Sequence, residues 1–400
     1  MVQVTERIHR GLFSRLFNSI IGVAIGFVLI PVSMMLIGWN EYRTIHRAKG
    51  LIEGESVVVD LANSDNIDSA YSGKLIHAIG LATTSESLSD PEFGVSGKLL
   101  QLRRMVEMYQ WVEKVESKTR KKIGGGEETV KTYSYDKQWL PGREESENFH
   151  EVSGHINPQQ RFSAQQSISN HATFGAFALR PEQVSKIDRW TEARLDEGSL
   201  FEKFDLAERE RFKVEGGYVY YSHRRPDSTA PQVGDQRIRL EVVQPTQISV
   251  LGKQDQNAIS PFKTSNGEII DSLHVGQVSA SEMFANLKQQ NTFLAMLLRV
   301  AGWGLSVVGF MLIASPLKTL TDIVPFFGKM VGAVTFFIAV ILGSCVSLIT
   351  VSIAWVAVRP LYSISLLTIV CVVIFILLRR RWNPDKTSRQ QISVIEQTQQ

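Results

Sequence analysis

Two histidines and an adjacent carboxylate come closest to a metal-binding pattern. His150 and His155 are five residues apart, and Glu151 follows the first of them. In the zincin motif the two histidines are four residues apart, so that one helix turn presents both to zinc. Gly154 and Pro158 also argue against a helix here. We therefore expect no metal ion, and interpret both histidines as loop residues with ordinary hydrogen bonds.

The glycine clusters and serines carry no cofactor or nucleophile motif. Gly124-Gly125-Gly126 and Gly216-Gly217 lack the lysine and hydroxyl of a P-loop and the spacing of a dinucleotide fingerprint, which favours turns. No G-x-S-x-G element occurs. We therefore expect no cofactor and no catalytic residue. An enzyme that combines acidic residues from separate strands remains an open alternative, because such a site is assembled only in space.

The chain around these residues has two parts of different composition. Residues 40–293 contain 31 Lys and Arg against 36 Asp and Glu, whereas the remainder is basic, with a net charge of +8. The basic part holds nearly every long apolar run and both cysteines, Cys345 and Cys371. These features exclude a purely soluble enzyme, a disordered chain and a disulfide-stapled secreted module. The sequence predicts a membrane protein with one large polar domain.

Four apolar stretches are long enough for transmembrane helices, which need about 20 residues each. The first lacks a cleavage site and is therefore no signal peptide, and Pro31 predicts a kink in it. Arg299, near the start of the second, is expected to extend to the membrane boundary. The short Arg359-Pro360 turn joins the last two into a hairpin. The predicted spans are residues 17–39, 293–314, 331–358 and 361–378.

The cations beside the spans predict their orientation. Four spans place both termini on one side, and cations are enriched on the cytoplasmic side. Residues 1–16, the connector 315–330 and the basic tail 379–400 are therefore predicted to be cytoplasmic, and residues 40–292 extracytoplasmic. The absence of an N-x-[ST] acceptor in this domain favours a bacterial source. The ten flanking cations on the cytoplasmic side are Arg7, Arg10, Arg15, Lys318, Lys329, Arg379, Arg380, Arg381, Lys386 and Arg389.

The polar domain is predicted to be mixed but rich in strands. Residues 105–116 and 129–135 alternate in polarity around a glycine turn and predict a hairpin. A helix is predicted over 181–195, and another from about Ser279 or Ser281 into the second span. The fold class is therefore an α+β membrane protein with four transmembrane helices and a β-rich domain inserted between the first and second. Further strands are expected at 73–81, 218–222, 238–243 and 248–251.

Small residues in the spans predict close helix packing. Gly22 and Gly26 form a GxxxG motif, and Ala339, Gly343 and Ser347 form a ridge on the third span. Contacts within one protomer and contacts between protomers both remain open. For the connector, a short interfacial helix bracketed by two prolines, Pro316 and Pro325, and a reentrant connector are equally open.

Ionisable groups are rare within the predicted membrane region. Spans one, three and four contain no Asp, Glu, His or Lys in their interiors, which argues against a transporter or an intramembrane enzyme. The rival interpretation of a passive channel rests on the hydroxyls of span three. These are Ser344, Ser347, Thr350 and Ser352.

The segment around Tyr109 and Trp111 resembles the LUMA family (transmembrane protein 43). It includes Leu88-Ser89-Asp90-Pro91 and the string from Leu102 to Glu113, and the likeness covers about residues 17–378. The chain departs from the family at Tyr42, where known members have glycine, and in both tails. Other matching islands are Asn40-Glu41 with Arg43, Asn148-Phe149 with His155, Asn157 and Pro158, Val233-Gly234-Asp235 with Arg237, Pro261-Phe262 with Thr264, Ala301-Gly302-Trp303, Pro325-Phe326, and Trp355 with Arg359-Pro360-Leu361.

The resemblance implies a four-span protein with a lumenal or periplasmic domain that self-associates and acts as a membrane scaffold. Family members in eukaryotes reside in the endoplasmic reticulum and inner nuclear membrane and contact emerin and lamins, partners that are not carried over to this chain. A bacterial member would lie in the inner membrane. The family offers no established catalytic residues.

We therefore expect a non-enzymatic scaffold whose partners are itself, membrane lipids and other membrane proteins, without nucleic acid. An oligomeric channel and an extracytoplasmic domain that binds a lipid or ligand remain alternatives. Tyr109 and Trp111 are expected on one strand face, either in an assembly contact or in the core of the domain. The assembly or fold positions implied by the resemblance are Asn40, Glu41, Arg43, Asp90, Pro91, Tyr109, Trp111, His155, Asp235, Trp303, Arg359 and Pro360.

Overall fold

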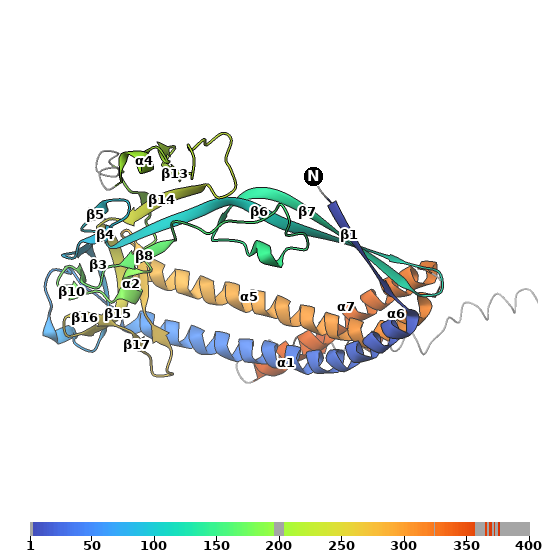
Figure 1. The fold of residues 1–400 in the computed structure, drawn as a ribbon. Helices are drawn as coiled ribbons and strands as arrows, with labels where there is room; N and C mark the ends of the chain where they lie inside the picture. Colours follow the sequence, from blue (N-terminus) through green and yellow to red (C-terminus); the bar gives the residue numbers. More distant parts are fainter. Residues whose placement is uncertain are drawn as a thin grey trace, which may run out of the picture. The chain divides into compact units, whose positions relative to one another are not determined.

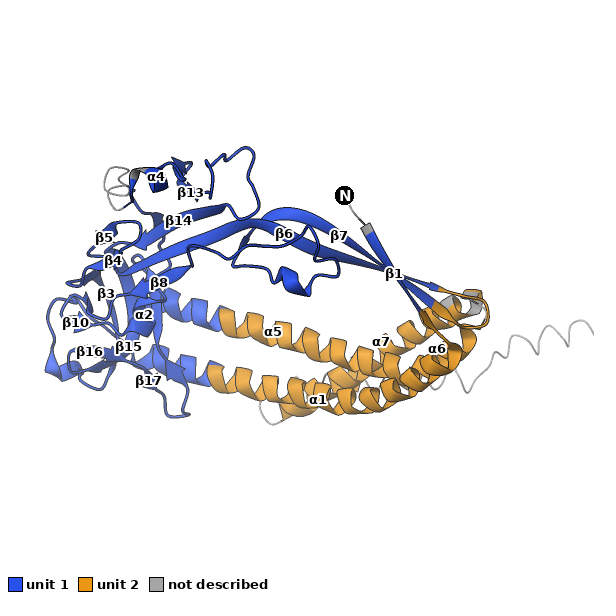
Figure 2. Cartoon of the chain, in the orientation of Figure 1, with its two compact units in different colours: residues 1–8, 48–120, 128–289 blue, residues 9–47, 121–127, 290–400 orange. Residues whose placement is uncertain are grey.

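The structure, a computed structural model, describes residues 3–195, 204–323 and 325–356, with six more residues between 365 and 376. The chain divides into two compact units (Figure 2). Unit 1 comprises residues 1–8, 48–120 and 128–289, and unit 2 comprises residues 9–47, 121–127 and 290–400. Arg359, Pro360, the tail 379–400 and most of the predicted span 361–378 lie outside the described residues.

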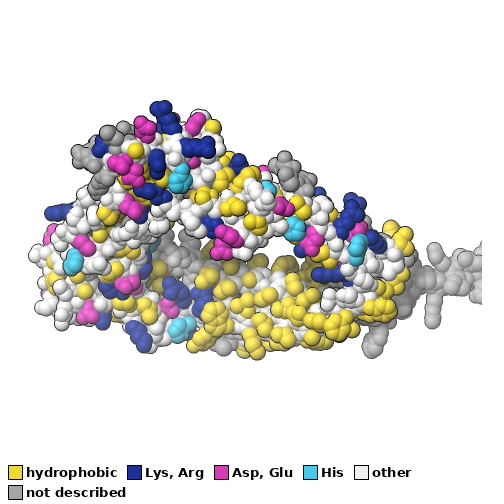
Figure 3. Space-filling model, in the orientation of Figure 1, with side chains coloured by type: hydrophobic (Ala, Val, Ile, Leu, Met, Phe, Trp, Pro, Cys, Tyr) yellow, Lys and Arg dark blue, Asp and Glu magenta, His cyan; other side chains and the backbone are white. Residues whose placement is uncertain are grey.

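Three helices in the described part of the chain are long and apolar enough to cross a membrane. They are α1 (Leu12–Val57), α5 (Ala280–Ile313) and α7 (Pro325–Val356). In the space-filling view, hydrophobic side chains gather over these helices (Figure 3). The first three predicted spans are thus confirmed as apolar helices, whereas the fourth stays a prediction. Helix α1 also continues past the predicted end at Trp39. The polar residues that follow belong to the same helix, which ends at Val57.

Glycines let the helices of unit 2 pack closely within one protomer. A Cβ atom added at Gly26 of α1 would lie 2.5 Å from the carbonyl oxygen of Gly309 on α5. A Cβ atom at Gly343 of α7 would lie 2.7 Å from a methyl group of Val307. Both small-residue motifs are therefore used inside the chain, where backbones approach without intervening side chains.

The connector between α5 and α7 contains a short helix, which was one of the two alternatives left open by the sequence. Helix α6 (Ser315–Thr321) carries Pro316 in its first turn, and Pro325 begins α7. Leu317 and Leu320 on α6 are exposed, while Thr319 is buried. Helix α6 therefore has one exposed apolar side and one buried side. Its position in a membrane interface remains a prediction.

The larger sheet of unit 1 is built on the predicted hairpin (Figure 1). Its strands β6 (Gln101–Lys121) and β7 (Glu127–Pro141) flank a turn closed by a 2.8 Å hydrogen bond from Lys122 N to Gly126 O. Gly124 and Gly125 have φ of 91° and 79°, which only glycine adopts without strain. The strand order is β1 (Gln3–Arg10), β7, β6, β14 (Gln236–Val243), β13 (Tyr218–Tyr221) and β12 (Phe212–Glu215), with β8 (Gln165–Ile168) paired to β6 and β11 (Thr191–Glu192) paired to β14.

A second sheet contributes most of the remaining core of unit 1. Its centre is the long antiparallel pair β3 and β15, whose buried faces include Ile76, Ile248 and Val250. The order is β19 (Ser272–Val275), β15 (Thr246–Asp255), β16 (Ala258–Ser260), β10 (Phe177–Ala178), β9 (Ala172–Phe174), β3 (Leu75–Thr84) and β2 (Val59–Asp60). Two small ribbons pair β4 (Leu88–Asp90) with β5 (Val95–Gly97) and β17 (Phe262–Lys263) with β18 (Ile269–Ile270).

The predicted helix over 181–195 is wrong beyond its first turn. Helix α2 covers only Pro181–Val184, and the chain then enters β11, where Thr191 pairs with Val242. Trp190 instead lies beneath the guanidinium of Arg103, 4.0 Å from the ring centroid. Pairing with β14 therefore overrides the helical pattern of the apolar residues. By contrast, the predicted helix start near Ser279 is confirmed, because the Ser279 hydroxyl accepts a hydrogen bond from the Glu282 amide.

Candidate functional site

Three apolar helices of unit 2 each contribute one group to a buried polar cluster. Glu41 of α1 is only 1% exposed. It accepts hydrogen bonds from Arg299 Nε and Nη2 of α5, at 2.5 and 2.8 Å, and from Trp355 Nε1 of α7, at 2.7 Å. A buried carboxylate is tolerated only with such donors. The guanidinium of Arg299, which was predicted to extend to the membrane boundary, turns to Glu41, and its depth in the membrane stays a prediction.

The surroundings of this cluster leave several polar atoms unpartnered. Asn40 donates to Ala295 O at 3.0 Å and Asn291 donates to Thr44 O at 2.9 Å. The side-chain oxygens of both asparagines, and Nε and Nη2 of Arg43, are buried without a hydrogen-bond partner among the described residues. Buried polar groups are normally satisfied, so the network is incomplete here, as it is at Gln160 and Gln254 in unit 1.

A pocket of about 500 Å³ lies beside the cluster, with walls from α1, α5 and α7. Trp303, one of the positions implied by the resemblance, lines it and donates its indole N–H to Ser344 Oγ at 3.0 Å. Apolar walls with few polar groups suit an apolar or amphiphilic molecule rather than a metal ion. The lining residues are Ile37, Arg299, Val300, Trp303, Ser344, Ser347, Leu348, Val351 and Trp355.

The hydroxyls of span three have different partners. Thr350 and Ser352 donate to carbonyl oxygens of their own helix, those of Val346 and Leu348, at 2.8 and 2.7 Å. Ser344 accepts from an indole, whereas Ser347 Oγ is buried without a partner among the residues described. The line of hydroxyls that suggested a channel is thus largely occupied by intramolecular hydrogen bonds.

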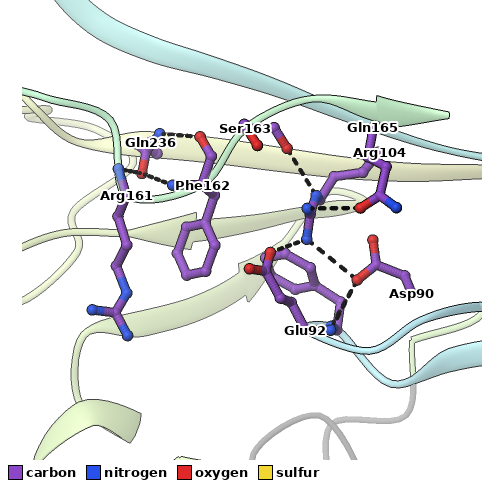
Figure 4. Close-up of polar contacts among 9 residues, drawn as sticks. Asp90, Glu92, Arg104, Arg161, Phe162, Ser163, Gln165 and Gln236 are labelled. Atoms are coloured by element: carbon purple, nitrogen blue, oxygen red, sulfur yellow. Dashed lines mark hydrogen bonds and ion pairs between the residues drawn. The ribbon is translucent and has the colours of Figure 1, made fainter.

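In unit 1, Asp90 belongs to a closed hydrogen-bond network (Figure 4). Its carboxylate accepts from the backbone amide of Glu92 at 3.0 Å and from Arg104 Nη1 at 3.3 Å. Arg104 also pairs with the carboxylate of Glu92, and Pro91 lies in the turn between them. These contacts fix the ribbon β4–β5 to β6, which is a fold role. The other acceptors of Arg104 are Ser163 O and Gln165 Oε1.

Trp111 and His155 meet in an aromatic stack at the side of the hairpin. The His155 ring packs edge-on against Trp111, at 4.7 Å, and face to face with Tyr135, at 3.9 Å. Asn157 exchanges two hydrogen bonds with the backbone of Trp111, at 2.8 and 3.0 Å, and so continues the strand ladder with its side chain. Burial and a hydrogen bond to Glu113 raise the pKa of Tyr135 to about 12. Both Trp111 and His155 therefore support the fold.

Tyr109 contributes to a half-buried face of the larger sheet, which we call the aromatic–arginine face. Its ring lies 5.4 Å from Trp139, whose ring lies 6.2 Å from Tyr220. The Arg237 guanidinium stacks 4.8 Å from the ring centroid of Trp139 and 5.1 Å from that of Tyr218. The adjoining residue Asp235 accepts a hydrogen bond from Tyr109 N through its backbone oxygen, at 2.8 Å, and its carboxylate accepts one from a nearby backbone amide at 2.7 Å. The face comprises Tyr109, Trp139, Tyr218, Tyr220 and Arg237.

The hairpin tip joins a second buried carboxylate in unit 2. Asp322, 1% exposed, accepts from Lys121 Nζ at 2.6 Å and from Arg15 Nη2 at 2.5 Å. Burial alone would raise the pKa of Asp322, but the two cations hold it below its usual value. The contact is at odds with the predicted sidedness, because it joins the domain 40–292 to the connector 315–330. Groups 2.6 Å apart lie on the same side of a membrane, so this pair and the positions of the flanking cations lead to different expectations for residue 121. The sidedness of both segments remains a prediction.

The histidines do not converge on a metal site. His150 stacks on Tyr133 with a centroid distance of 4.0 Å, whereas His155 stacks on Tyr135 with a centroid distance of 3.9 Å. Among the residues that the structure describes, no three His, Cys, Asp or Glu side chains form a group that could hold a metal. Sequence analysis missed the partnership of Glu41 and Arg299, for which the only signal was a single arginine in an apolar span.

Comparison with known proteins identifies the family. The model described as transmembrane protein 43 matches residues 108–360. Transmembrane protein 43 of Rattus norvegicus is 32% identical over 397 residues, 95% of each chain, and that of Homo sapiens is 30% identical over 380 residues, 91% of each. The homolog of Drosophila melanogaster is 25% identical over 349 residues, 86% of this chain and 90% of its own.

No solved structure matches the chain. The relatives named above are animal proteins, so the expected bacterial source receives no support from them. The family match covers more than half of the sequence, and the similarity to the rat protein extends over nearly all of it. The chain therefore belongs to the transmembrane protein 43 family.

Proposed function

We propose that this membrane protein is a non-enzymatic scaffold that self-associates through the aromatic–arginine face of unit 1. The single observation that carries the proposal is the composition of that face. Tyr, Trp and Arg dominate the binding energy of protein interfaces, because they combine large contact area with a polar group. Here they lie half-buried together on one sheet, around a pocket of about 350 Å³ that Tyr218 and Arg237 line.

The packing of unit 2 supports this assignment of the contact to the polar domain. The small-residue ridges of α1 and α7 already pack against α5. They are therefore occupied within one protomer, and self-association rests on another surface. The hydroxyls of span three are mostly bonded inside the chain, which weighs against the alternative of a channel.

The mass of the protein extracted directly into native lipid discs tests self-association. We expect a defined oligomer for the natural sequence and a shift to monomer in the double variant Tyr218→Ala, Tyr220→Ala. As a control, Tyr71→Ala removes a partly buried tyrosine that packs against another core and should leave the mass unchanged. A monomeric natural protein, or an unchanged oligomer in a folded double variant, would contradict the proposal.

We further propose that both termini are cytoplasmic, and that the hairpin tip decides the sidedness of the polar domain. A cysteine at Lys118, an exposed position near the tip, in a background with Cys345→Ser and Cys371→Ser, can be labelled with a membrane-impermeant maleimide. Labelling from the cytoplasmic side is expected if the Lys121–Asp322 pair forms in the membrane. Labelling only from the other side would support the extracytoplasmic assignment of all of 40–292.

A further inference from the structure

The turn between β6 and β7 presents an apolar side chain to its surroundings. Ile123, which lies in this turn, is 91% exposed. No large hydrophobic residue in the described part of the chain is more exposed. The residues that follow it, Gly124 and Gly125, have no side chain that could cover it. A single exposed isoleucine is ordinary on a protein surface, so its setting decides what it can bind.

Two hydrogen bonds attach this turn to the helical part of unit 2, to which residues 121–127 belong (Figure 2). Arg15 Nη1 donates to Gly125 O at 2.6 Å, and Gly124 N donates to Ile323 O at 3.2 Å. Arg15 lies on α1, just before the first predicted span. Arginines near the end of a membrane span extend to the level of the lipid headgroups. The turn is therefore expected at the membrane surface, where that span begins.

A second exposed apolar side chain lies at the same end of α1. Gly125 packs on Leu12, since a Cβ atom added at this glycine would lie 2.7 Å from a methyl group of the leucine. The next residue of the helix, Phe13, is 85% exposed. Phe13 and Ile123 thus come from segments far apart in the chain, and both are uncovered where α1 begins. Such side chains are favoured at the boundary between lipid headgroups and acyl chains.

Cations dominate the strand end that leads into the turn. Residues 118–126 contain four Lys or Arg and no Asp or Glu. Lys121 is paired with the buried Asp322 and so holds the turn in place. Lys118 lies 3.4 Å from the carboxylate of Glu116, but both side chains are mostly exposed, so this pair is weak. The exposed cations of the segment are Lys118, Arg120 and Lys122. Each cation close to an anionic lipid surface strengthens the attraction about fivefold.

We infer that the hairpin tip is a membrane anchor that binds the anionic surface of the leaflet in which α1 begins. Ile123 and Phe13 enter the boundary of the acyl chains, and the exposed cations contact lipid phosphate groups. The anchor lies apart from the aromatic–arginine face and goes beyond the proposed scaffold function. It rests on the attachment of the tip to unit 2 and not on self-association. The hairpin would thereby respond to the charge of that leaflet.

Spin-label accessibility in the full-length protein provides the test. A nitroxide is attached at Ile123→Cys in a background with Cys345→Ser and Cys371→Ser. The protein is reconstituted into vesicles of dioleoylphosphatidylcholine, with or without dioleoylphosphatidylglycerol. We expect the label to collide with oxygen, which concentrates in lipid, and to be protected from a water-soluble nickel chelate about fivefold better in the anionic vesicles. A label at Ile156→Cys, an exposed isoleucine of the polar domain, is the control and should meet the chelate equally in both.

Charge reversal separates the role of the cations from that of the apolar residues. The double variant Lys118→Glu, Arg120→Glu should abolish the difference between the two kinds of vesicle. The matched control Lys98→Glu, Lys263→Glu makes the same change of charge at exposed lysines elsewhere in unit 1 and should preserve the difference. Thermal unfolding of each variant shows that it is folded.

Three results would overturn the inference. If the label at residue 123 meets the chelate as freely as the label at residue 156, the tip lies in water. If it meets neither oxygen nor the chelate, protein covers the tip, for example a second copy of the chain. If it is equally protected in both kinds of vesicle, or if the charge reversal changes nothing, the tip does not recognise an anionic surface.

Discussion

Two buried carboxylates, one in each unit, are paired with arginine in different ways. Asp90 of unit 1, 4% exposed, accepts from backbone amides as well as from Arg104, and Arg104 has further acceptors. Glu41 of unit 2 depends on two side chains, Arg299 and Trp355. Polar atoms of its neighbours lack partners in the described chain. The first network is closed and fixes a loop, whereas the second is surrounded by buried polar atoms without a partner in the described chain.

The reason for the difference is the source of the donors. A turn such as that after Asp90 presents backbone N–H groups to a side chain. Within a helix the backbone groups are already paired, so Glu41 has access to side chains alone. In apolar surroundings such a carboxylate has no water to replace a lost partner. The two units should therefore respond unequally to the loss of their arginines.

The largest effect is expected for Arg299→Met. It leaves Glu41 buried with only the indole of Trp355, and breaking a buried pair costs about 3–5 kcal/mol. Chemical unfolding in detergent micelles would measure the loss. The double variant Glu41→Gln, Arg299→Met should recover part of it, because no buried charge then remains. A loss for the single variant below that of Arg104→Met would refute the comparison.

A smaller loss, about 1–3 kcal/mol, is expected for Arg104→Met. Asp90 keeps its backbone donors, and the side chain of Glu92, which is about half exposed, can turn to water. The same unfolding measurement applies. Asp90→Asn serves as the control, since an asparagine oxygen still accepts from the turn amides. A loss in Asp90→Asn as large as that in Arg104→Met would mean that the stabilisation by Arg104 comes from the charge of Asp90, whereas no loss in Asp90→Asn would mean that it does not depend on that charge.

Helix packing in unit 2 can be tested with two glycines of α1. Gly26→Ala would force Cβ against Gly309 O, at 2.5 Å, and should cost about 1–3 kcal/mol. Gly38→Ala is the matched control, since no atom lies within 4 Å of its added Cβ. It should stabilise the helix by about 0.5–1 kcal/mol. Similar thermal stabilities for both variants would argue against close packing of α1 on α5.

The subtlest expected change is in the titration of Tyr135. The folded state holds this proton more tightly than an ordinary tyrosine, with a pKa of about 12 against 10. Its contribution to stability is thus complete below pH 10 and is lost as the pH rises towards 12. Near-ultraviolet absorbance should show one late-titrating tyrosine. Glu113→Gln should lower that pKa, although burial, the larger cause, would keep it above the usual value.

Local patterns were sufficient for many elements of this fold. The hairpin of β6 and β7 follows from alternation around Gly124 and Gly125, because both signals act between near neighbours. The same applies to the start of α5 after Ser279 and to the three apolar helices. The helix predicted at 181–195 failed because the competing partner, β14, lies some fifty residues away, and no local pattern indicates it.

The sequence by itself determined where three apolar helices form and where the β6–β7 hairpin turns, since hydrophobicity and turn chemistry are properties of short segments. Only the tertiary structure decided which partners meet. Glu41 and Arg299 are far apart in the chain, and neither residue by itself indicates that the other is its partner. The sequence likewise did not determine that Gly26 of α1 packs against Gly309 of α5. Such pairings depend on which helix faces pack together, and this is settled by the fit of whole surfaces rather than by local spacing.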